Sequence, residues 1–236
     1  MNAHALHCPP TLPTLRLVAG KKPTVDDIYP RLFDAILEQH IAPASRFTEE
    51  GLGELFGVSR SVIRRVLAKL SRQQVIVLRP NQRAQVAAPD ALQIREILEA
   101  RRLTEITVVQ LACTQATPMR IRLLRELIAR EREYSERDQR ATAIRLSGEF
   151  HLQLAAIADN APLAQFLNSL VPLTSLAIAQ YDAHACTRDS WQAHTLLVDA
   201  MEHRDTNAAA QRMTQYFDRL ESTLLTRARE ARAPTP

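Results

Sequence analysis

The hydrophobic residues of the chain recur mostly at the three- and four-residue spacing of an amphipathic α-helix. In the first third of the sequence this spacing predicts three helices, which follow the candidate N-caps Thr24, Thr48 and Ser59. Gly57 is expected to end the second helix, because glycine adopts the left-handed C-cap conformation without strain. The faces expected to be buried are Ile28, Leu32, Ala35 and Ile36, then Leu52, Leu55 and Phe56, then Val62, Ile63, Val66, Leu67 and Leu70.

A strand-like pattern follows the third helix. Residues 75–78 (Val-Ile-Val-Leu) and 84–87 (Ala-Gln-Val-Ala) are typical of short strands, and Pro80 and Asn81 between them favour a turn. We therefore expect a β-hairpin here. Helix, short helix, turn, basic helix and hairpin follow one another in the order of a winged helix-turn-helix, a fold that places one helix in the major groove of DNA.

Beyond Pro89 the chain shows no strand-like alternation and predicts consecutive amphipathic helices. With only 5 glycines, and with Ala, Leu, Arg, Glu and Gln predominant, the composition favours helices as well. The expected helices span 90–116, 118–138, 140–159, 161–182, 187–204 and 205–230. The predicted fold class is mainly α, with an N-terminal winged helix-turn-helix at 23–88 and a C-terminal antiparallel α-helical bundle at 90–230.

Residues 1–22 contain several prolines and little periodicity, which predicts a flexible N-terminal arm. His4, His7 and Cys8 in this arm are either metal ligands or incidental residues of a disordered tail. Three scattered cysteines without a CxxC pair argue against a disulfide framework and fit a reducing compartment. Neither a signal peptide nor an apolar run of about 18 residues is evident, so we expect a cytoplasmic protein with no membrane partner.

The net charge is only +4, but the basic residues concentrate between Gly57 and Pro89, where no Asp or Glu occurs. Such a block is typical of an element that binds a polyanion, and the alternative is a solvated basic face. Arginines on a helix bridge guanine O6 and N7 or clamp phosphates, and serines at a helix N-terminus suit phosphate contact. The residues expected to contact double-stranded DNA are Ser59, Arg60, Ser61, Arg64, Arg65, Arg79, Asn81 and Arg83. Because one recognition helix reads few base pairs, we expect a homodimer on a palindromic operator.

Residues 55–70 (LFGVSRSVIRRVLAKL) resemble the helix-turn-helix of GntR-type bacterial regulators, whose usual string is L-G-V-S-R-T-P-V-R-E-A-L-x-x-L. The positions that match are Gly57, Val58, Ser59, Arg60, Arg64, Leu67 and Leu70. Val62 replaces the usual proline, Arg65 the usual glutamate, and Arg83 a usual glycine of the hairpin. The resemblance implies a transcriptional regulator, most often a repressor, with an operator that its relatives do not specify.

The second half of the chain resembles, in patches, the FCD domain, which is the sensor of the FadR branch of that family. The patches lie at 100–105 (ARRLTE), at 149–163 (Glu-Phe-His, then Asn-Ala-Pro-Leu) and at 193–200 (AHTLLVDA). The resemblance implies a dimerising domain in which one Asp and three His hold a divalent metal that receives a carboxylate effector. His151 and His194 occupy two of these ligand positions, whereas Ser147 and Tyr216 replace the Asp and the last His.

Two readings of this site remain open. In the first, His151 and His194 bind a zinc or nickel ion whose third ligand is Asp182, His184 or Cys186, because such sites usually need three protein ligands. In the second, a metal-free pocket formed by Ser147, His151, His194 and Tyr216 binds the effector directly, and Arg101 pairs with its carboxylate. The structural alternative is a local i,i+4 ion pair between Arg101 and Glu105, with both histidines satisfied in the core.

The predicted function is therefore a ligand-responsive transcriptional regulator without enzymatic activity. One alternative is a metal-dependent hydrolase that uses His151 and His194, but the lack of a paired carboxylate, of an HExxH motif and of a G-x-S-x-G motif counts against it. The other alternative is a DNA-binding protein that responds to no effector.

Overall fold

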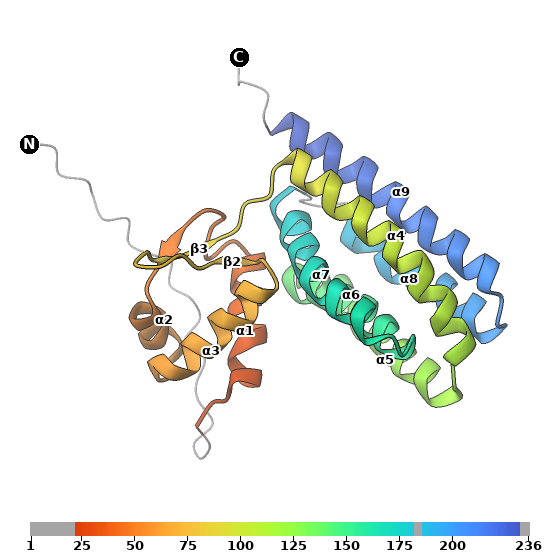
Figure 1. Cartoon of the computed structure of the whole chain (residues 1–236), viewed down its shortest axis with the longest axis horizontal. Helices are drawn as coiled ribbons and strands as arrows, with labels where there is room; N and C mark the ends of the chain where they lie inside the picture. The colour runs from red at the N-terminus through yellow and green to blue at the C-terminus, as the bar shows by residue number, and fades with distance from the viewer. Residues whose placement is uncertain (1–21, 182–185, 232–236) are drawn as a thin grey trace, which may run out of the picture.

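The computed structural model describes residues 22–181 and 186–231, and its elements form a small N-terminal group beside a larger group of helices (Figure 1). Residues 1–21 of the predicted arm, with His4, His7 and Cys8, lie outside the described residues, as do Asp182 and His184. The N-terminal elements are α1 (Val25–Leu37), β1 (Arg46–Phe47), α2 (Glu49–Phe56), α3 (Arg60–Arg72), β2 (Ile76–Val77) and β3 (Ala84–Val86). The mainly α class predicted from the sequence is confirmed.

The three N-terminal helices begin at the predicted N-caps, and the second ends at the predicted C-cap. The backbone N–H of Thr24 donates to the Asp27 carboxylate over 2.8 Å at the start of α1. Thr48 Oγ1 accepts from the backbone N–H of Gly51 over 3.1 Å at the start of α2. Gly57 ends α2 with φ 64°, in the left-handed region. The turn between α2 and α3 is therefore specified locally.

Leu55 is a wrong prediction, since its side chain is 49% exposed rather than buried. The buried side of α2 is made by Leu52, Gly53 and Phe56, and Leu55 lies roughly 100° around the helix from its centre. Gly53 sets this orientation, because a Cβ there would lie 3.0 Å from the backbone oxygen of Val58. The side of α2 that carries Gly53 therefore packs against the core, and the side that carries Leu55 is exposed.

The predicted hairpin is confirmed as β2 and β3, but the sheet contains a third strand. The strand order is β1-β3-β2, and all pairs are antiparallel, with Arg46 opposite Gln85 and Ile76 opposite Val86. The two-residue strand β1 has no hydrophobic alternation of its own, so only its pairing with β3 identifies it. The sheet closes the α1–α3 core from one side.

The six helices predicted for the C-terminal half are confirmed, with ends that differ by at most two residues. They are α4 (Ala91–Gln115), α5 (Pro118–Glu136), α6 (Arg140–Ile157), α7 (Ala161–Tyr181), α8 (Cys186–Glu202) and α9 (Thr206–Glu230). In Figure 1, α4 and α9 run side by side along one edge of the bundle, and α6 packs against α4, α5 and α7. Among the described residues, α7 alone is long and apolar enough to span a membrane, and 56% of its apolar window is buried within this bundle.

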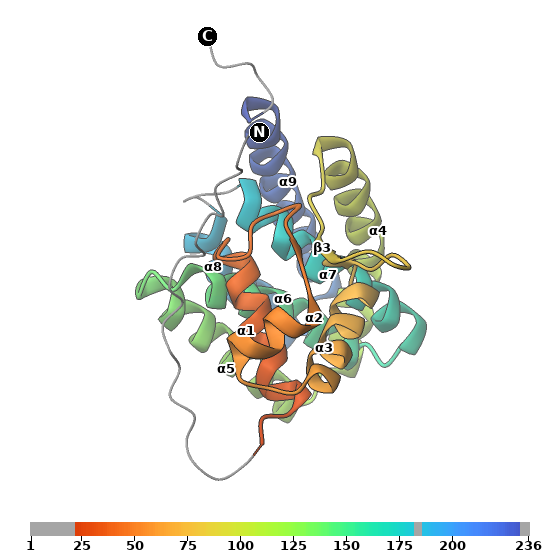
Figure 2. The same ribbon diagram turned by 90° about the vertical axis from the view of Figure 1, so that its left-hand side faces the viewer.

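The two groups of elements meet where α1 packs against α6 and α7. Figure 2 looks onto this N-terminal group, with the helices of the bundle behind it. Arg145 on α6 donates to both carboxylate oxygens of Asp34 on α1, over 2.6 and 3.1 Å, and Thr142 donates to the same carboxylate over 3.3 Å. Gln39 donates to the backbone oxygen of Ala179 over 2.8 Å. The N-terminal group of elements is therefore held to the helix that carries His151.

We expect the substitution Gly57→Ala to lower the free energy of unfolding by about 1 kcal/mol, because an L-residue with positive φ crowds its Cβ against the backbone. Chemical denaturation followed by circular dichroism measures the change. Ala44→Gly is the contrasting variant, since Ala44 has φ 60° and glycine relieves the same crowding there. A loss of stability at Ala44 equal to that at Gly57 would contradict the argument.

Candidate DNA interface and sensor site

The exposed side of α3 carries the predicted DNA contacts. Val62, Ile63, Val66, Leu67 and Leu70 are buried against the module core, as predicted. The opposite side is consequently turned outward: the side chains of Arg60 and Arg64 are 67% and 65% exposed, and Ser59, Ser61 and Arg65 are exposed as well. The buried stripe alone therefore orients the basic face.

The turn between β2 and β3 adds a second exposed basic element. Arg79, Asn81 and Arg83 are all exposed in this turn. Asn81 has φ 57°, a left-handed conformation that asparagine tolerates better than most residues, and the N–H of Gln82 donates to the oxygen of Arg79 over 3.2 Å. The tight turn presents both arginines at its tip.

Sequence reasoning missed Glu49, whose carboxylate binds both Arg60 and Arg64 on the exposed side of α3. Its carboxylate accepts from Arg60 Nε over 2.9 Å, from Arg64 Nε over 3.1 Å and from Arg64 Nη2 over 3.0 Å. Hydrogen bonds from Arg64 and Arg60 lower the pKa of this carboxyl below its usual value. Glu49 lies 11 and 15 residues before its partners, so only the packing of α2 on α3 brings them together.

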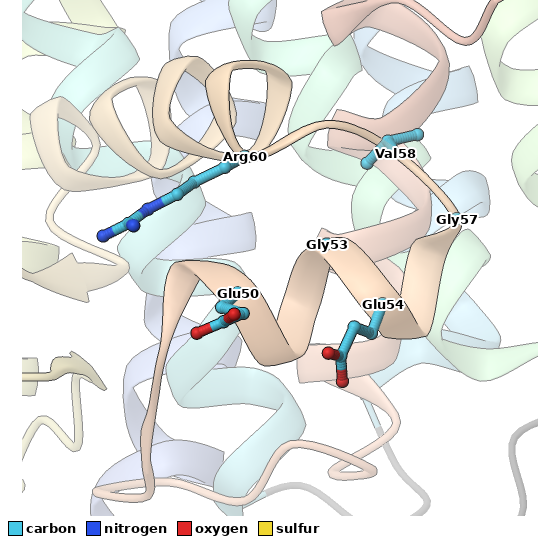
Figure 3. A pocket seen from close by; sticks show the side chains of 6 residues that line it. All are labelled: Glu50, Gly53, Glu54, Gly57, Val58 and Arg60. Carbon is cyan, nitrogen blue, oxygen red and sulfur yellow. The ribbon is translucent and has the colours of Figure 1, made fainter.

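A shallow hollow of about 500 Å³ lies between α2 and the start of α3 (Figure 3). Its lining consists of Glu50, Gly53, Glu54, Gly57, Val58 and Arg60. In Figure 3, Arg60 extends from the first turn of α3 in the direction of the N-terminal end of α2, where Glu50 lies. The hollow is open and its walls are largely backbone and exposed charge, so it has no features of a metabolite site.

The helical bundle brings together three of the predicted sensor residues. The rings of His151 on α6 and His194 on α8 lie 5.1 Å apart, and the Tyr216 ring on α9 lies 5.0 and 5.5 Å from them. Both histidines are almost fully buried, and Phe150 stacks on His194 at 4.1 Å. Ser147 is buried one turn before His151 on the same helix.

Each histidine is held by a buried carboxylate. His151 Nδ1 lies 2.5 Å from Glu105 Oε2, and His194 Nδ1 lies 2.8 Å from Glu131 Oε2. Ser190 Oγ donates to the other Glu131 oxygen over 2.5 Å. Glu131 was missed, although the sequence holds a signal: it continues the buried stripe of α5 that includes Ile121, Leu124 and Ile128. An acid on an apolar stripe indicates a buried polar partner.

These contacts determine which nitrogen of each imidazole carries a proton. Burial lowers the pKa of His151 to about 4 although Glu105 opposes this, so the ring is neutral at pH 7. Burial raises the pKa of Glu105, but Arg101 and His151 outweigh it and lower that pKa to about 2. The ionised carboxylate accepts from Nδ1–H of His151, which leaves its Nε2 with a free lone pair. Nε2 of His151 and Nε2 of His194 are both buried without a hydrogen-bond partner among the described residues.

Arg101 forms the local ion pair that the sequence allowed as an alternative. Its Nε donates to Glu105 Oε1 over 2.7 Å, and Nη2 lies 2.7 Å from the same oxygen. The guanidinium is 2% exposed and lies over the Phe217 ring at 5.2 Å. Nη2 nonetheless makes no hydrogen bond among the described residues, so an effector carboxylate would share the guanidinium with Glu105.

The donor set of the described residues does not fit a resident zinc or nickel ion. His151 and His194 offer two nitrogen lone pairs, while Ser147 and Tyr216 offer only hydroxyl groups, which are weak ligands. Glu105 and Glu131 already bind the Nδ1 atoms. Within 22–181 and 186–231, no group of three His, Cys, Asp or Glu side chains is placed to hold a metal. Asp182 and His184, proposed as third ligands, lie outside the described residues, as does the side chain of Cys186.

We predict that the free energy of unfolding falls as the pH falls from about 6.5 to 4, by on the order of 3 kcal/mol from His151. The unfolded chain binds a proton in this window, and the folded protein excludes it from the buried ring. Glu105 extends the loss of stability between pH 4.5 and 2, because it is ionised only when folded. Urea denaturation across this pH range, in the presence of EDTA, measures the effect.

The substitution His151→Gln should flatten the upper part of this pH dependence. An NMR titration of the wild-type protein gives an independent check that requires no variant. An imidazole of His151 that titrates near pH 6.5 would contradict the assignment of a neutral, carboxylate-bound ring.

Comparisons with known proteins agree with this geometry. The family model described as bacterial regulatory proteins of the gntR family matches residues 24–86, and the FCD domain model matches residues 96–219, more than half of the chain. The chain is 25% identical over 194 residues to the Uxu operon regulator of Haemophilus influenzae, which covers 75% of this chain and 72% of the relative. It is 24% identical over 204 residues to the HTH-type transcriptional repressor RspR of Escherichia coli, which covers 86% and 90%, respectively.

Solved structures share the fold. E. coli McbR/YncC superimposes with a TM-score of 0.71 at 20% sequence identity, over 86% of this chain and 97% of the other. The family models cover the winged helix-turn-helix and the helical bundle separately and in the same order as the two groups of elements. The chain therefore belongs to the GntR-type transcriptional regulators that carry an FCD domain.

Proposed function

We propose that this protein is a cytoplasmic homodimeric repressor that binds a palindromic operator and whose DNA affinity is set by a small metabolite. In this proposal residues 23–88 bind DNA, and residues 90–230 bind the effector and form the dimer. The observation that carries the proposal is the exposed basic face of α3 beside the basic turn of the hairpin. The relatives are named as regulators, which supports a protein without enzymatic activity.

The DNA-binding half of the proposal follows from shape and charge. An α-helix fits the major groove, where arginine reads guanine and serines at the helix N-terminus bind phosphate. Arg79, Asn81 and Arg83 then contact the backbone or the minor groove beside it. Two copies are needed because a single helix of this length reads few base pairs, and a two-fold operator supplies the second half-site.

The effector half rests on the two unpaired imidazole nitrogens. A buried acceptor without a partner costs about 1–3 kcal/mol, and a ligand that donates hydrogen bonds to both Nε2 atoms removes that cost. Because each free Nε2 lone pair accepts a hydrogen bond, we place donor groups of the effector, ammonium or hydroxyl, at His151 and His194. Ser147 and Tyr216 complete the site, which functions without a metal. The lack of a third metal ligand among the described residues disfavours the hydrolase alternative.

Coupling between the two halves runs through α6. His151 faces the sensor site, and Arg145, one and a half turns earlier, binds Asp34 of the DNA-binding module. A ligand shifts the equilibrium between two arrangements only as far as it binds one better than the other. An effector that binds one position of α6 better than another therefore changes which arrangement of the DNA-binding modules is preferred.

We expect the wild-type protein to select a two-fold symmetric sequence from a random duplex pool, and Arg64→Ala to weaken that complex at least tenfold. The reason is the loss of one bidentate base contact in each half-site, each worth about 1–3 kcal/mol. Fluorescence anisotropy at several salt concentrations measures both affinities. Arg137→Ala, which removes an exposed arginine of the bundle, is the matched control and should change nothing.

If the wild-type protein selects no sequence, or if the two variants behave alike, α3 is not the recognition helix.

Effector binding is expected to raise the melting temperature of the protein in a panel of amines, amino acids and polyols more than in simple carboxylates. At a hundredfold excess over Kd, a ligand adds about 2.7 kcal/mol to the free energy of unfolding. The measurement is a thermal shift assay with and without EDTA, followed by elemental analysis for zinc and nickel. A response that EDTA abolishes, or bound metal in stoichiometric amount, would overturn the metal-free site.

A further inference from the structure

Arginine has two edges that each present a pair of hydrogen-bond donors, one formed by Nε and Nη2 and one formed by the two Nη groups. Glu49 occupies the first edge of Arg64, with Nε 3.1 Å and Nη2 3.0 Å from the carboxylate. It also accepts from Arg60 Nε over 2.9 Å. The second edge of each guanidinium is left for another partner, and both side chains remain about two thirds exposed.

We propose that Glu49 is a positioning residue for sequence readout: it holds Arg64 and Arg60 by their Nε edges and presents their outer edges to guanine. This inference rests on the proposed function, because it concerns how α3 reads DNA. The outer edge of arginine matches the O6 and N7 acceptors of guanine in the major groove. An arginine held in this way loses less conformational freedom on binding than a free one.

The same carboxylate limits binding to DNA of the wrong sequence. Each arginine that neutralises a phosphate releases counterions, and this term is independent of sequence. Glu49 places one negative charge between two of the exposed cations and next to the expected path of the phosphates. The carboxylate therefore weakens binding that depends on phosphate contacts alone, whereas binding to guanine is strengthened because the arginines are already oriented. Specific interfaces commonly combine favourable contacts to the right partner with unfavourable contacts to the wrong one.

The fold makes this clamp geometrically possible at Gly53. A Cβ at this position would lie 3.0 Å from the backbone oxygen of Val58, so glycine allows the close approach of α2 to the turn before α3. Glu49 lies one turn before Gly53, in the first turn of α2, and thus reaches the first two turns of α3. Its pKa, lowered by the arginine hydrogen bonds, keeps the carboxylate charged at neutral pH.

The test compares Glu49→Gln with Glu50→Gln. Both variants remove one negative charge from the first turn of α2, but Glu50 is exposed and forms no bond to either arginine within the described structure. Affinities are measured by anisotropy for the duplex selected by the wild-type protein and for a random-sequence duplex, each from low to high salt. Circular dichroism and denaturation confirm that both variants fold.

For Glu49→Gln we expect tighter binding to the random duplex, with a plot of log K against log salt steeper by about 1–2, since each additional phosphate contact adds roughly 0.9. The ratio of specific to non-specific affinity should fall at least about tenfold, because one base contact is weakened in each of the two half-sites. Glu50→Gln should leave that ratio within about twofold of the wild-type value, because electrostatics alone change both affinities together.

A second variant separates orientation from charge. Arg64→Lys keeps the charge but has no second edge, so it should lower the specificity ratio, and Glu49→Gln should add little in the double variant. Equal ratios for Glu49→Gln and Glu50→Gln, or additive effects in the double variant, would overturn the proposal. If the wild-type protein itself does not discriminate between the duplexes, the proposed function fails, and this result is distinct from either outcome.

Discussion

The buried carboxylate of Glu105 is the group on which the sensor half depends. A charge in a protein core is costly unless it is paired and hydrogen-bonded. Both carboxylate oxygens of Glu105 have a hydrogen-bond partner. Arg101 pairs with it along α4, and His151 donates to it from α6. Loss of Arg101 would leave an uncompensated charge, and loss of His151 would leave Oε2 of Glu105 without its hydrogen bond. The contact therefore fixes both the register of the two helices and the tautomer of His151. The free Nε2 lone pair of that ring is a direct consequence.

Helix α6 converts this local constraint into a property of the whole chain. One side of it carries His151 and Ser147, and another carries Arg145, which is bound to Asp34 of the first helix. No loop intervenes between these positions. Gly148 lies between them, where a Cβ would meet Ser175 Oγ at 3.0 Å, so α6 also approaches α7 closely. A rigid helix packed tightly on both sides transmits a small displacement more directly than a flexible connection would.

Local periodicity in the sequence predicts most of the fold but little of the site chemistry. The buried stripe of α3 depends only on helical spacing, and it suffices to predict which arginines are exposed. Leu55 is predicted wrongly because the packing of α2 depends on Gly53 and a backbone oxygen in the next turn. Glu49 and Glu131 are missed for a related reason, since their partners lie on other helices. Arg101 has two predicted roles in the sequence, and only the three-dimensional arrangement pairs it with Glu105.

Both halves of the molecule use a carboxylate to orient nitrogen donors, but their environments give it different consequences. Glu105 and Glu131 are buried, where a low dielectric strengthens their bonds to the histidines, and there they determine structure. Glu49 lies at the surface, where ion pairs contribute about 0–1 kcal/mol to stability, so its contacts with arginine contribute little to folding. In the proposed complex, Glu49 instead affects the free energy of DNA binding, because DNA excludes water from the same arginines. The surface carboxylate thus acts on selectivity, whereas the buried carboxylates act on the shape of the site.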